Sequence, residues 1–190
     1  MSDGQMTDFA AVPATTDAAE VRAVLDALDS AGCPAWLEGG WGVDALAGRQ
    51  TRPHRDLDIA IDASQESLVL ATLDRLGYTI ETDWRPTRVE LVAPGRGWVD
   101  VHPVVLDSAG DGVQTGLDGE TYRYPAAGFT TGTVAGRTVG CISVEQQIAW
   151  RSGFALRAVD HHDLAVLHQL LAARQPADGA MEDPVEDADG

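Results

Sequence analysis

Hydrophobic residues recur along this chain in short groups bounded by Gly, Pro or polar residues, and their spacing predicts an α/β protein. The first group follows the 3.6-residue period of a helix that Thr15 or Thr16 would cap and Gly32 would end. Ser64 and Asp160 are the predicted N-caps of two later helices. Helices are predicted over residues 17–31, 41–46, 65–76, 143–151 and 159–173, and strands over residues 34–37, 57–61, 78–83, 88–92 and 98–106.

The strand predicted over residues 98–106 shows the clearest alternation of apolar and polar positions. Val99 and Val101 point to one face, which we expect to be buried. Asp100 and His102 point to the opposite face. The strand therefore presents two chemically active side chains on a single surface of the sheet.

The remaining pattern completes a small mixed sheet. Pro94-Gly95 forms a turn between two strands that should pair antiparallel. Residues 107–119, rich in Gly and Asp, are predicted to be a loop, followed by two weak β segments near Tyr122 and near Val134. The predicted fold class is α/β, a mixed sheet with flanking helices and a small helical C-terminal part. We expect a flexible N-terminus over residues 1–16, a core over 17–140, the C-terminal helical part over 141–174 and a disordered acidic tail over 175–190.

Charge and composition limit the classes of function. The 190-residue chain carries a net charge of −17, whereas a nucleic-acid backbone needs a basic surface, so no nucleic-acid partner is expected. The apolar segments are too short to cross a membrane, and residues 1–16 lack the pattern of a signal peptide. Cys33 and Cys141 lie far apart without metal-ligand spacing and are predicted to be reduced thiols. A cytoplasmic protein with no membrane partner is predicted, and its acidity suits a divalent metal or a cationic small molecule.

The strongest chemical signal is Asp56-Leu57-Asp58. On a strand, side chains two residues apart share a face, so the two carboxylates lie side by side while Leu57, Ile59 and Ile61 enter the core. Adjacent carboxylates repel each other unless a cation lies between them. Oxygen ligands with this spacing suit Mg²⁺, which also binds substrate phosphates. The alternative for an isolated D-x-D is a solvated edge strand.

Two further features give this motif a context. Gly39-Gly40 lies between a predicted strand and a predicted helix, where the backbone can approach phosphates closely. Asp100 supplies a third carboxylate from a later strand. This combination predicts a metal site formed by Asp56, Asp58 and Asp100, and phosphoryl transfer by in-line displacement.

Several neighbouring residues are candidates for supporting roles. Glu90 would act as a base, hold an amine or hydroxyl of the acceptor, or form a surface pair with Arg88; His102 would be a base, a hydrogen-bond donor or a structural residue. One residue among Arg52, His54 and Arg55 is expected to contact the nucleotide. We interpret Asp44 as stabilising a helix terminus and Asp62 as part of a solvated turn. The four residues Asp160-His161-His162-Asp163 do not favour a metal site, because adjacent helical histidines diverge.

The motifs resemble the polymerase-β-like nucleotidyltransferase superfamily, whose signature is Gly-Gly or Gly-Ser followed by D-x-D. The segments 39–44 and 51–58 are similar to its antibiotic-modifying branch, which contains the lincosamide nucleotidyltransferases and the aminoglycoside 2''-nucleotidyltransferases. Segments 83–91, 99–103, 141–143 and 160–163 are similar to the lincosamide enzymes. The resemblance covers residues 17–170 and implies that Asp56 and Asp58 bind Mg²⁺. It also implies that Asp100 ligates a second metal or takes the acceptor's proton, and that Gly39 and Gly40 hold the nucleotide phosphates.

The resemblance thus implies transfer of a nucleoside monophosphate from ATP or another NTP to a hydroxyl of a lincosamide-like antibiotic, releasing pyrophosphate. Two alternatives remain open at this stage: the same chemistry on an aminoglycoside or another metabolite, and a non-catalytic nucleotide-binding regulatory module. All three carboxylates are present, which favours a catalyst. A homodimer is a further possibility for a chain of this size.

Overall fold

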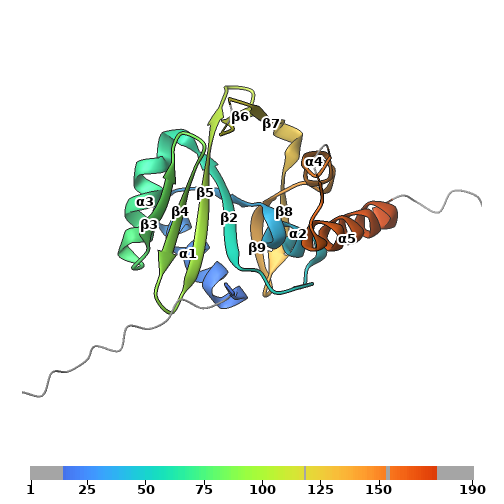
Figure 1. Ribbon diagram of the computed structural model, residues 1–190, viewed down its shortest axis with the longest axis horizontal. Coiled ribbons are helices and arrows are strands. Elements are labelled where there is room, and N and C mark those ends of the chain that lie inside the picture. The colour runs from blue at the N-terminus through green and yellow to red at the C-terminus, as the bar shows by residue number, and fades with distance from the viewer. Residues whose placement is uncertain (1–14, 118, 153–154, 175–190) are drawn as a thin grey trace, which may run out of the picture.

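The computed structural model describes residues 15–117, 119–152 and 155–174 and shows a mixed sheet with helices packed against it (Figure 1). Seven strands form the main sheet in the order β3-β4-β5-β2-β1-β9-β8, and β6 and β7 form a hairpin that extends the far end of β5. The strands are β1 (Ala35–Leu37), β2 (Asp56–Asp62), β3 (Thr79–Trp84), β4 (Arg88–Ala93), β5 (Gly97–Leu106), β6 (Gly112–Thr115), β7 (Thr121–Tyr124), β8 (Phe129–Val134) and β9 (Arg137–Ile142). The predicted fold class is confirmed.

The helices form two groups. Helices α1 (Ala18–Ser30) and α3 (Glu66–Arg75) bury their apolar sides against one face of the sheet. Helices α2 (Gly39–Ala47), α4 (Val144–Trp150) and α5 (Ala158–Arg174) contact one another near β8 and β9 (Figure 1). Two short 3-10 turns, Ala63–Gln65 and Ala126–Gly128, complete the connections. Among the described residues, no helix is both long and apolar enough to span a bilayer.

The main core lies between the sheet and the α1/α3 layer. Alternate residues of three central strands point into it and are almost fully buried: Leu57, Ile59, Ile61, Val89, Leu91, Val99 and Val101. Because the side-chain period of a strand is two, the opposite face of the same strands must carry the other set of residues. The core thereby fixes which side chains of β2, β4 and β5 face the remaining space.

Three predicted helix caps are wrong. Asp17, not Thr15 or Thr16, caps α1 by accepting a hydrogen bond from Glu20 N–H at 2.8 Å. Thr16 is buried and its N–H donates to the carbonyl of His54 at 2.8 Å. Ser64 does not cap α3. It lies in the 3-10 turn that precedes this helix, and Asp62 caps that turn.

The third error concerns α5, which begins at Ala158, so Asp160 lies within its first turn. Asp160 Oδ2 accepts from the N–H of Arg157 at 2.9 Å, which is the reverse bond of a capping box. Ser143 is confirmed as the cap of α4.

The middle of the chain contains more β structure than predicted. Strand β6 lies within the predicted loop over residues 107–119, and β9 was not predicted. Strands β6 and β9 have only four and six residues, and each contains a glycine, so their alternation of apolar and polar positions is weak. Pairing with neighbouring strands, rather than local propensity, determines that these segments are strands. Strand β9 also ends at Ile142, inside the predicted C-terminal helical part, whose limits stay a prediction. The predicted tail and residues 1–14 of the predicted flexible N-terminus lie outside the described residues.

Candidate active site

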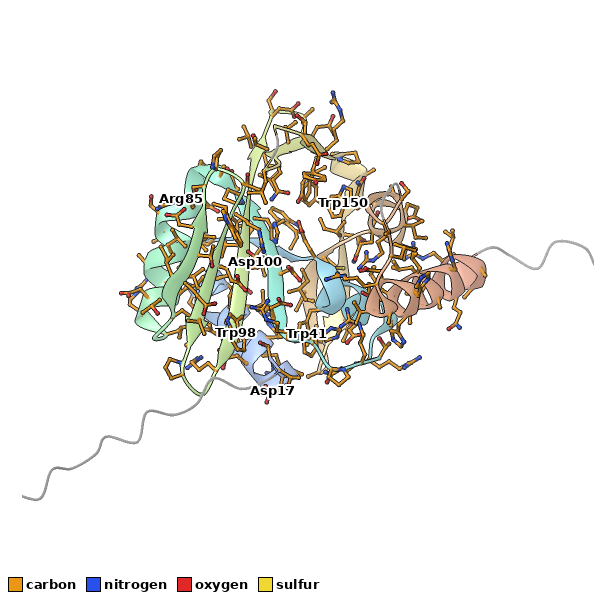
Figure 2. All side chains as sticks on the ribbon, viewed as in Figure 1. Asp17, Trp41, Arg85, Trp98, Asp100 and Trp150 are labelled. Carbon is orange, nitrogen blue, oxygen red and sulfur yellow. The ribbon has the colours of Figure 1, made fainter. Side chains whose placement is uncertain are left out.

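Three acidic side chains lie in register on adjacent strands at the centre of the sheet. Strands β2 and β5 are parallel and pair Asp58 with Asp100, whereas β4 and β5 are antiparallel and pair Asp100 with Glu90. The odd-numbered residues of β2 enter the core, so Asp56 and Asp58 share the opposite face as predicted. Figure 2 shows Asp100 near the middle of the molecule.

Asp58, Asp100 and His102 form the tightest cluster. One ligand atom from each lies within 4.8 Å of the others. His102 Nε2 is 3.5 Å from Asp58 Oδ1 and 3.8 Å from Asp100 Oδ2. Asp100 is 3% exposed, and its Oδ1 has no hydrogen-bond partner among the described residues. A buried carboxylate oxygen without a donor beside a second carboxylate fits a hard divalent cation such as Mg²⁺.

The electrostatics of the D-x-D pair also fit a cation. Burial, followed by the charge of Asp58, raises the pKa of Asp56. Burial would also raise the pKa of Asp58, but His102 and the charges of Arg88 and Arg151 outweigh it and lower that pKa. The pKa of His102 is raised because the charges of Glu38 and Asp58 outweigh its burial. Asp56 Oδ2 accepts from Arg55 at 2.9 Å, so this carboxylate already uses one cationic partner.

Gly39 and Gly40 bring the start of α2 against this cluster. Gly39 has φ +51°, and a Cβ placed on it would lie 2.2 Å from Asp58 Oδ2. A Cβ on Gly40 would lie 2.2 Å from His54 Nδ1. Both positions therefore exclude side chains because of close approach, and the N–H groups of the first turn of α2 lie beside the carboxylates. Phosphate binding by these glycines stays a prediction.

The three basic residues before the D-x-D have different surroundings. Arg52 binds Asp163 of α5 through two hydrogen bonds of 2.8 and 2.9 Å. His54 is only 3% exposed and packs on Trp41. Arg55 lies over the ring of Trp98 and donates hydrogen bonds to Asp56 and Glu90. Arg55 is thus the one of the three that contacts Asp56 and Glu90, whereas Arg52 and the buried His54 lie against Gly40. Nucleotide contact by one of the three stays a prediction.

His54 and Asp44 form a buried pair that the sequence interpretation missed. His54 Nε2 is 2.5 Å from Asp44 Oδ2, and Asp44 Oδ1 accepts from both the N–H and the hydroxyl of Thr51. The interpretation of Asp44 as a helix-terminus residue is wrong, because it lies within α2 and binds the loop between α2 and β2 back to this helix.

Glu90 and Arg88 do not pair with each other. Glu90 is 7% exposed, and its Oε1 accepts from Arg55 at 2.5 Å, so the predicted surface Arg–Glu pair is wrong in both partner and exposure. Arg88 instead contacts Asp100 and stacks on Trp84 with 4.2 Å between guanidinium and ring centroid. Each of the two innermost carboxylates of β4 and β5 thus has an arginine partner.

A cavity of about 380 Å³ opens next to His102. That volume lies within the range of pockets that bind drug-sized molecules. Its lining comes from β4, β5, the β6–β7 hairpin, α4 and the residue before α2: Glu38, Thr87, Arg88, His102, Gln114, Gly116, Leu117, Glu120, Tyr122, Tyr124 and Trp150. Figure 2 places Trp150 of α4 across from Asp100 of β5. We call this cavity the hairpin pocket.

Sequence reasoning missed most of the residues that line the hairpin pocket, among them Glu38, Gln114 and Tyr124. Gln114 and Tyr124 lie in the hairpin that was predicted to be a loop and a weak β segment, so their faces had no pattern to reveal them. Glu38 comes directly before Gly39-Gly40, and this adjacency was the available signal. Of the five tryptophans, only Trp150 contributes to the lining of this pocket in the part of the chain that the structure describes.

Comparison with known proteins identifies the family to which this fold and site belong. A sequence model of the aminoglycoside-2''-adenylyltransferase family matches residues 20–167. The chain belongs to this family. It is 37% identical to a lincosamide resistance protein of Staphylococcus haemolyticus over 151 residues, which is 80% of this chain and 94% of that protein. It is also 35% identical over 72 residues to a 2''-aminoglycoside nucleotidyltransferase of Klebsiella pneumoniae, 37% of this chain and 41% of that protein.

Solved structures of the family agree with the fold. The lincomycin-bound crystal structure of the lincosamide antibiotic adenylyltransferase LnuA has a TM-score of 0.75 and 36% identity, covering 82% of this chain and 99% of that one. The solution structure of the antibiotic-resistance factor ANT(2'')-Ia has a TM-score of 0.67 at 22% identity, over 82% of this chain and 84% of that one, and supports the fold alone. The resemblance inferred from the motifs is therefore confirmed.

Proposed function

We propose that this protein transfers a nucleoside monophosphate from ATP to a hydroxyl of a lincosamide-like antibiotic and releases pyrophosphate. The observation that carries the proposal is the register of Glu90, Asp100 and Asp58 on three adjacent strands, directly beside the hairpin pocket. The carboxylates are suited to a nucleotide with its metal, and the pocket to a small molecule that presents a hydroxyl to them.

In the reaction, the acceptor oxygen forms a bond to the α-phosphorus of ATP while the bond from this phosphorus to the bridging oxygen breaks. Asp56, Asp58 and Asp100 would hold Mg²⁺, which supplies positive charge to the phosphates. Asp100 Oδ1, which has no hydrogen-bond donor among the described residues, would either ligate the metal or take the proton of the hydroxyl. The start of α2 at Gly39 and Gly40 offers N–H groups to the phosphates. Arg55 supplies a cation on the same side.

A lincosamide acceptor is favoured by two observations. In sequence, the lincosamide resistance protein matches 80% of this chain and the aminoglycoside 2''-nucleotidyltransferase from Klebsiella pneumoniae matches 37% of it. In structure, LnuA and ANT(2'')-Ia both cover 82% of the chain, but the TM-score and identity are higher for LnuA. The pocket also combines aromatic and apolar side chains such as Tyr124, Trp150 and Leu117 with Arg88, and an arginine disfavours a polycation. The aminoglycoside remains the second candidate, because the chain is strongly acidic and two glutamates reach the pocket. Use of ATP places the proposed reaction in the cytoplasm.

The test is release of pyrophosphate in the presence of ATP and Mg²⁺ with lincomycin, clindamycin, kanamycin or no acceptor, for the wild type and Asp58→Asn. Release that requires a lincosamide and is lost in the variant supports the proposal. Release with kanamycin alone keeps the chemistry and assigns the aminoglycoside acceptor. Nucleotide binding without release on any acceptor favours a non-catalytic module. Sedimentation of the same sample would test the predicted homodimer.

A further inference from the structure

Glu38 is an acidic residue beside the active site whose role neither the metal cluster nor the fold explains. It precedes α2 as its N-cap, yet its side chain makes no capping hydrogen bond. Its backbone N–H donates to the carbonyl of Asp58 at 3.0 Å, which places it next to the reaction centre. Its side chain lines the hairpin pocket and is 7% exposed.

The protein leaves one oxygen of this carboxylate without a hydrogen-bond donor. Glu38 Oε1 is buried and has no partner among the described residues. The hydroxyl of Tyr124 lies close enough to interact with Glu38, but it donates its single hydrogen to Gln114 Oε1 at 2.8 Å. Tyr124 therefore has no second hydrogen for Glu38.

The amide of Gln114 cannot rotate to release this hydrogen. The carbonyl of Thr87 only accepts hydrogen bonds, so the group 2.8 Å from it must be the NH₂ of Gln114. The second hydrogen of this NH₂ is directed at His102 Nδ1, 3.0 Å away. His102 then carries its hydrogen on Nε2, which faces Asp58 and Asp100. The hydrogens of the Tyr124 hydroxyl and of the Gln114 amide are thus directed at other acceptors, and in the part of the chain that the structure describes no donor reaches Glu38 Oε1.

A buried carboxylate oxygen without a donor is unfavourable, and proteins rarely retain one away from a binding site. Glu38 borders a cavity large enough for a drug-sized molecule, so the missing donor can come from a ligand. We propose that Glu38 determines acceptor specificity by accepting a hydrogen bond from a hydroxyl or protonated amine that the acceptor carries near the hydroxyl under attack. This proposal rests on the proposed function, since it assigns the hairpin pocket to the acceptor.

The experiment compares the wild type with Glu38→Met, which keeps the length of the side chain but cannot accept this hydrogen bond. Glu145→Met is the matched control, because Glu145 lies on the exposed surface of α4 and pairs with Arg174. Steady-state rates of pyrophosphate release give kcat/KM for lincomycin and, separately, KM for ATP. Thermal unfolding of the same proteins without ligand gives Tm.

We expect Glu38→Met to lower kcat/KM for lincomycin about 10- to 100-fold, as for the loss of a hydrogen bond to a charged group. KM for ATP should stay within about twofold, because the carboxylates of β2 and β5 are intact. Tm should equal or exceed that of the wild type, because the substitution removes an unpartnered buried oxygen. Glu145→Met should match the wild type in both kinetic values.

Glu38→Gln separates the two kinds of donor. Its amide oxygen still accepts from a hydroxyl but lacks the charge that holds a protonated amine. Retention of most of kcat/KM in Glu38→Gln assigns a hydroxyl, and a loss equal to that of Glu38→Met assigns an amine. Either result supports the proposal.

Two results would overturn it. A value of kcat/KM within about twofold of the wild type in Glu38→Met contradicts acceptor binding while leaving the proposed function intact. A clear fall in Tm for Glu38→Met shows that the protein itself satisfies this carboxylate, and this conclusion holds whether or not any acceptor is turned over. Absence of turnover by the wild type counts against the proposed function instead, and the unfolding comparison then decides the role of Glu38.

Discussion

The two walls of the active site differ in how they are built. The carboxylate wall consists of Asp56, Asp58, Glu90 and Asp100, which project from long central strands whose other face is the main core. The hairpin pocket is lined largely by the β6–β7 hairpin with its turn, and Trp150 of the seven-residue helix α4 adds to it. A wall fixed by the core is suited to chemistry that needs constant geometry, whereas a wall formed by a hairpin and a short helix can vary with the acceptor.

From the difference between the two walls, we expect the largest loss of activity when a residue of the carboxylate wall is substituted. Asp58→Asn should lower kcat by roughly 100-fold or more, because a neutral amide replaces a charged metal ligand. Its Tm should fall modestly, because His102 and the charges of Arg88 and Arg151 stabilise the ionised form of Asp58 in the folded protein. Asp62→Asn is the control, because this residue shares the parity of Asp58 but caps the following 3-10 turn. Pyrophosphate release checks both variants, and a loss below about tenfold in Asp58→Asn would contradict the assigned role.

The next effect concerns the glycines that allow α2 to approach this wall. Gly39→Ala should reduce activity by roughly 10- to 100-fold, because its Cβ would displace Asp58, and backbone strain at φ +51° should add about 1 kcal/mol of destabilisation. Gly32→Ala is the matched control: its φ is +74°, but no atom of the described residues lies within 4 Å of the new Cβ. We expect the control to lose stability without losing activity. Equal activity losses in the two variants would show that strain alone is responsible.

A smaller and more selective effect is expected in the hairpin pocket. Trp150→Ala removes an aromatic ring that lines the pocket and packs on Tyr124 with ring centroids 4.7 Å apart. We expect KM for lincomycin to rise about 5- to 20-fold, consistent with the loss of one aromatic contact, while kcat and KM for ATP change little. Initial-rate measurements with each substrate varied in turn will show this. A fall in kcat with an unchanged KM for lincomycin would assign Trp150 to the chemistry instead.

The smallest effect lies outside both walls, at the start of α5. Hydrogen bonds from Arg157 hold the pKa of Asp160 at about 2, below its ordinary value of 3.8. Because the pKa is lowered in the folded protein, this stabilisation is complete above pH 3.8 and is lost as the pH falls to about 2. Arg157 is largely exposed, so the contribution should be only about 1 kcal/mol after screening by solvent.

Asp160→Asn should therefore be less stable than the wild type at pH 7 and should approach it at pH 2 to 3, as measured by denaturant unfolding across this range. A constant difference between the two proteins at every pH would show that the charge of Asp160 is not the cause.

Much of the carboxylate wall was predictable because local pattern and tertiary position coincide there. The period-two alternation of β2 and β5 placed Asp58, Asp100 and His102 on one face, and the structure brings them together. The alternation of β4 likewise placed Glu90 on that face. Partners could not be predicted in this way, because ion pairs join residues that are distant in sequence. Glu90 pairs with Arg55 rather than Arg88, and Arg52 reaches Asp163 of α5.

By itself, the sequence determined the elements with strong periods, the face that each central strand buries, and the motif that indicates nucleotidyl transfer. The tertiary structure decided the rest: the pairing of β6 with β7, the burial of His54 on Asp44, and the position of Glu38 beside the hairpin pocket, with one carboxylate oxygen that has no donor among the described residues. The physical reason is that periodicity reports which side of an element avoids water. Contacts between elements depend on packing of the whole chain, which no local pattern contains.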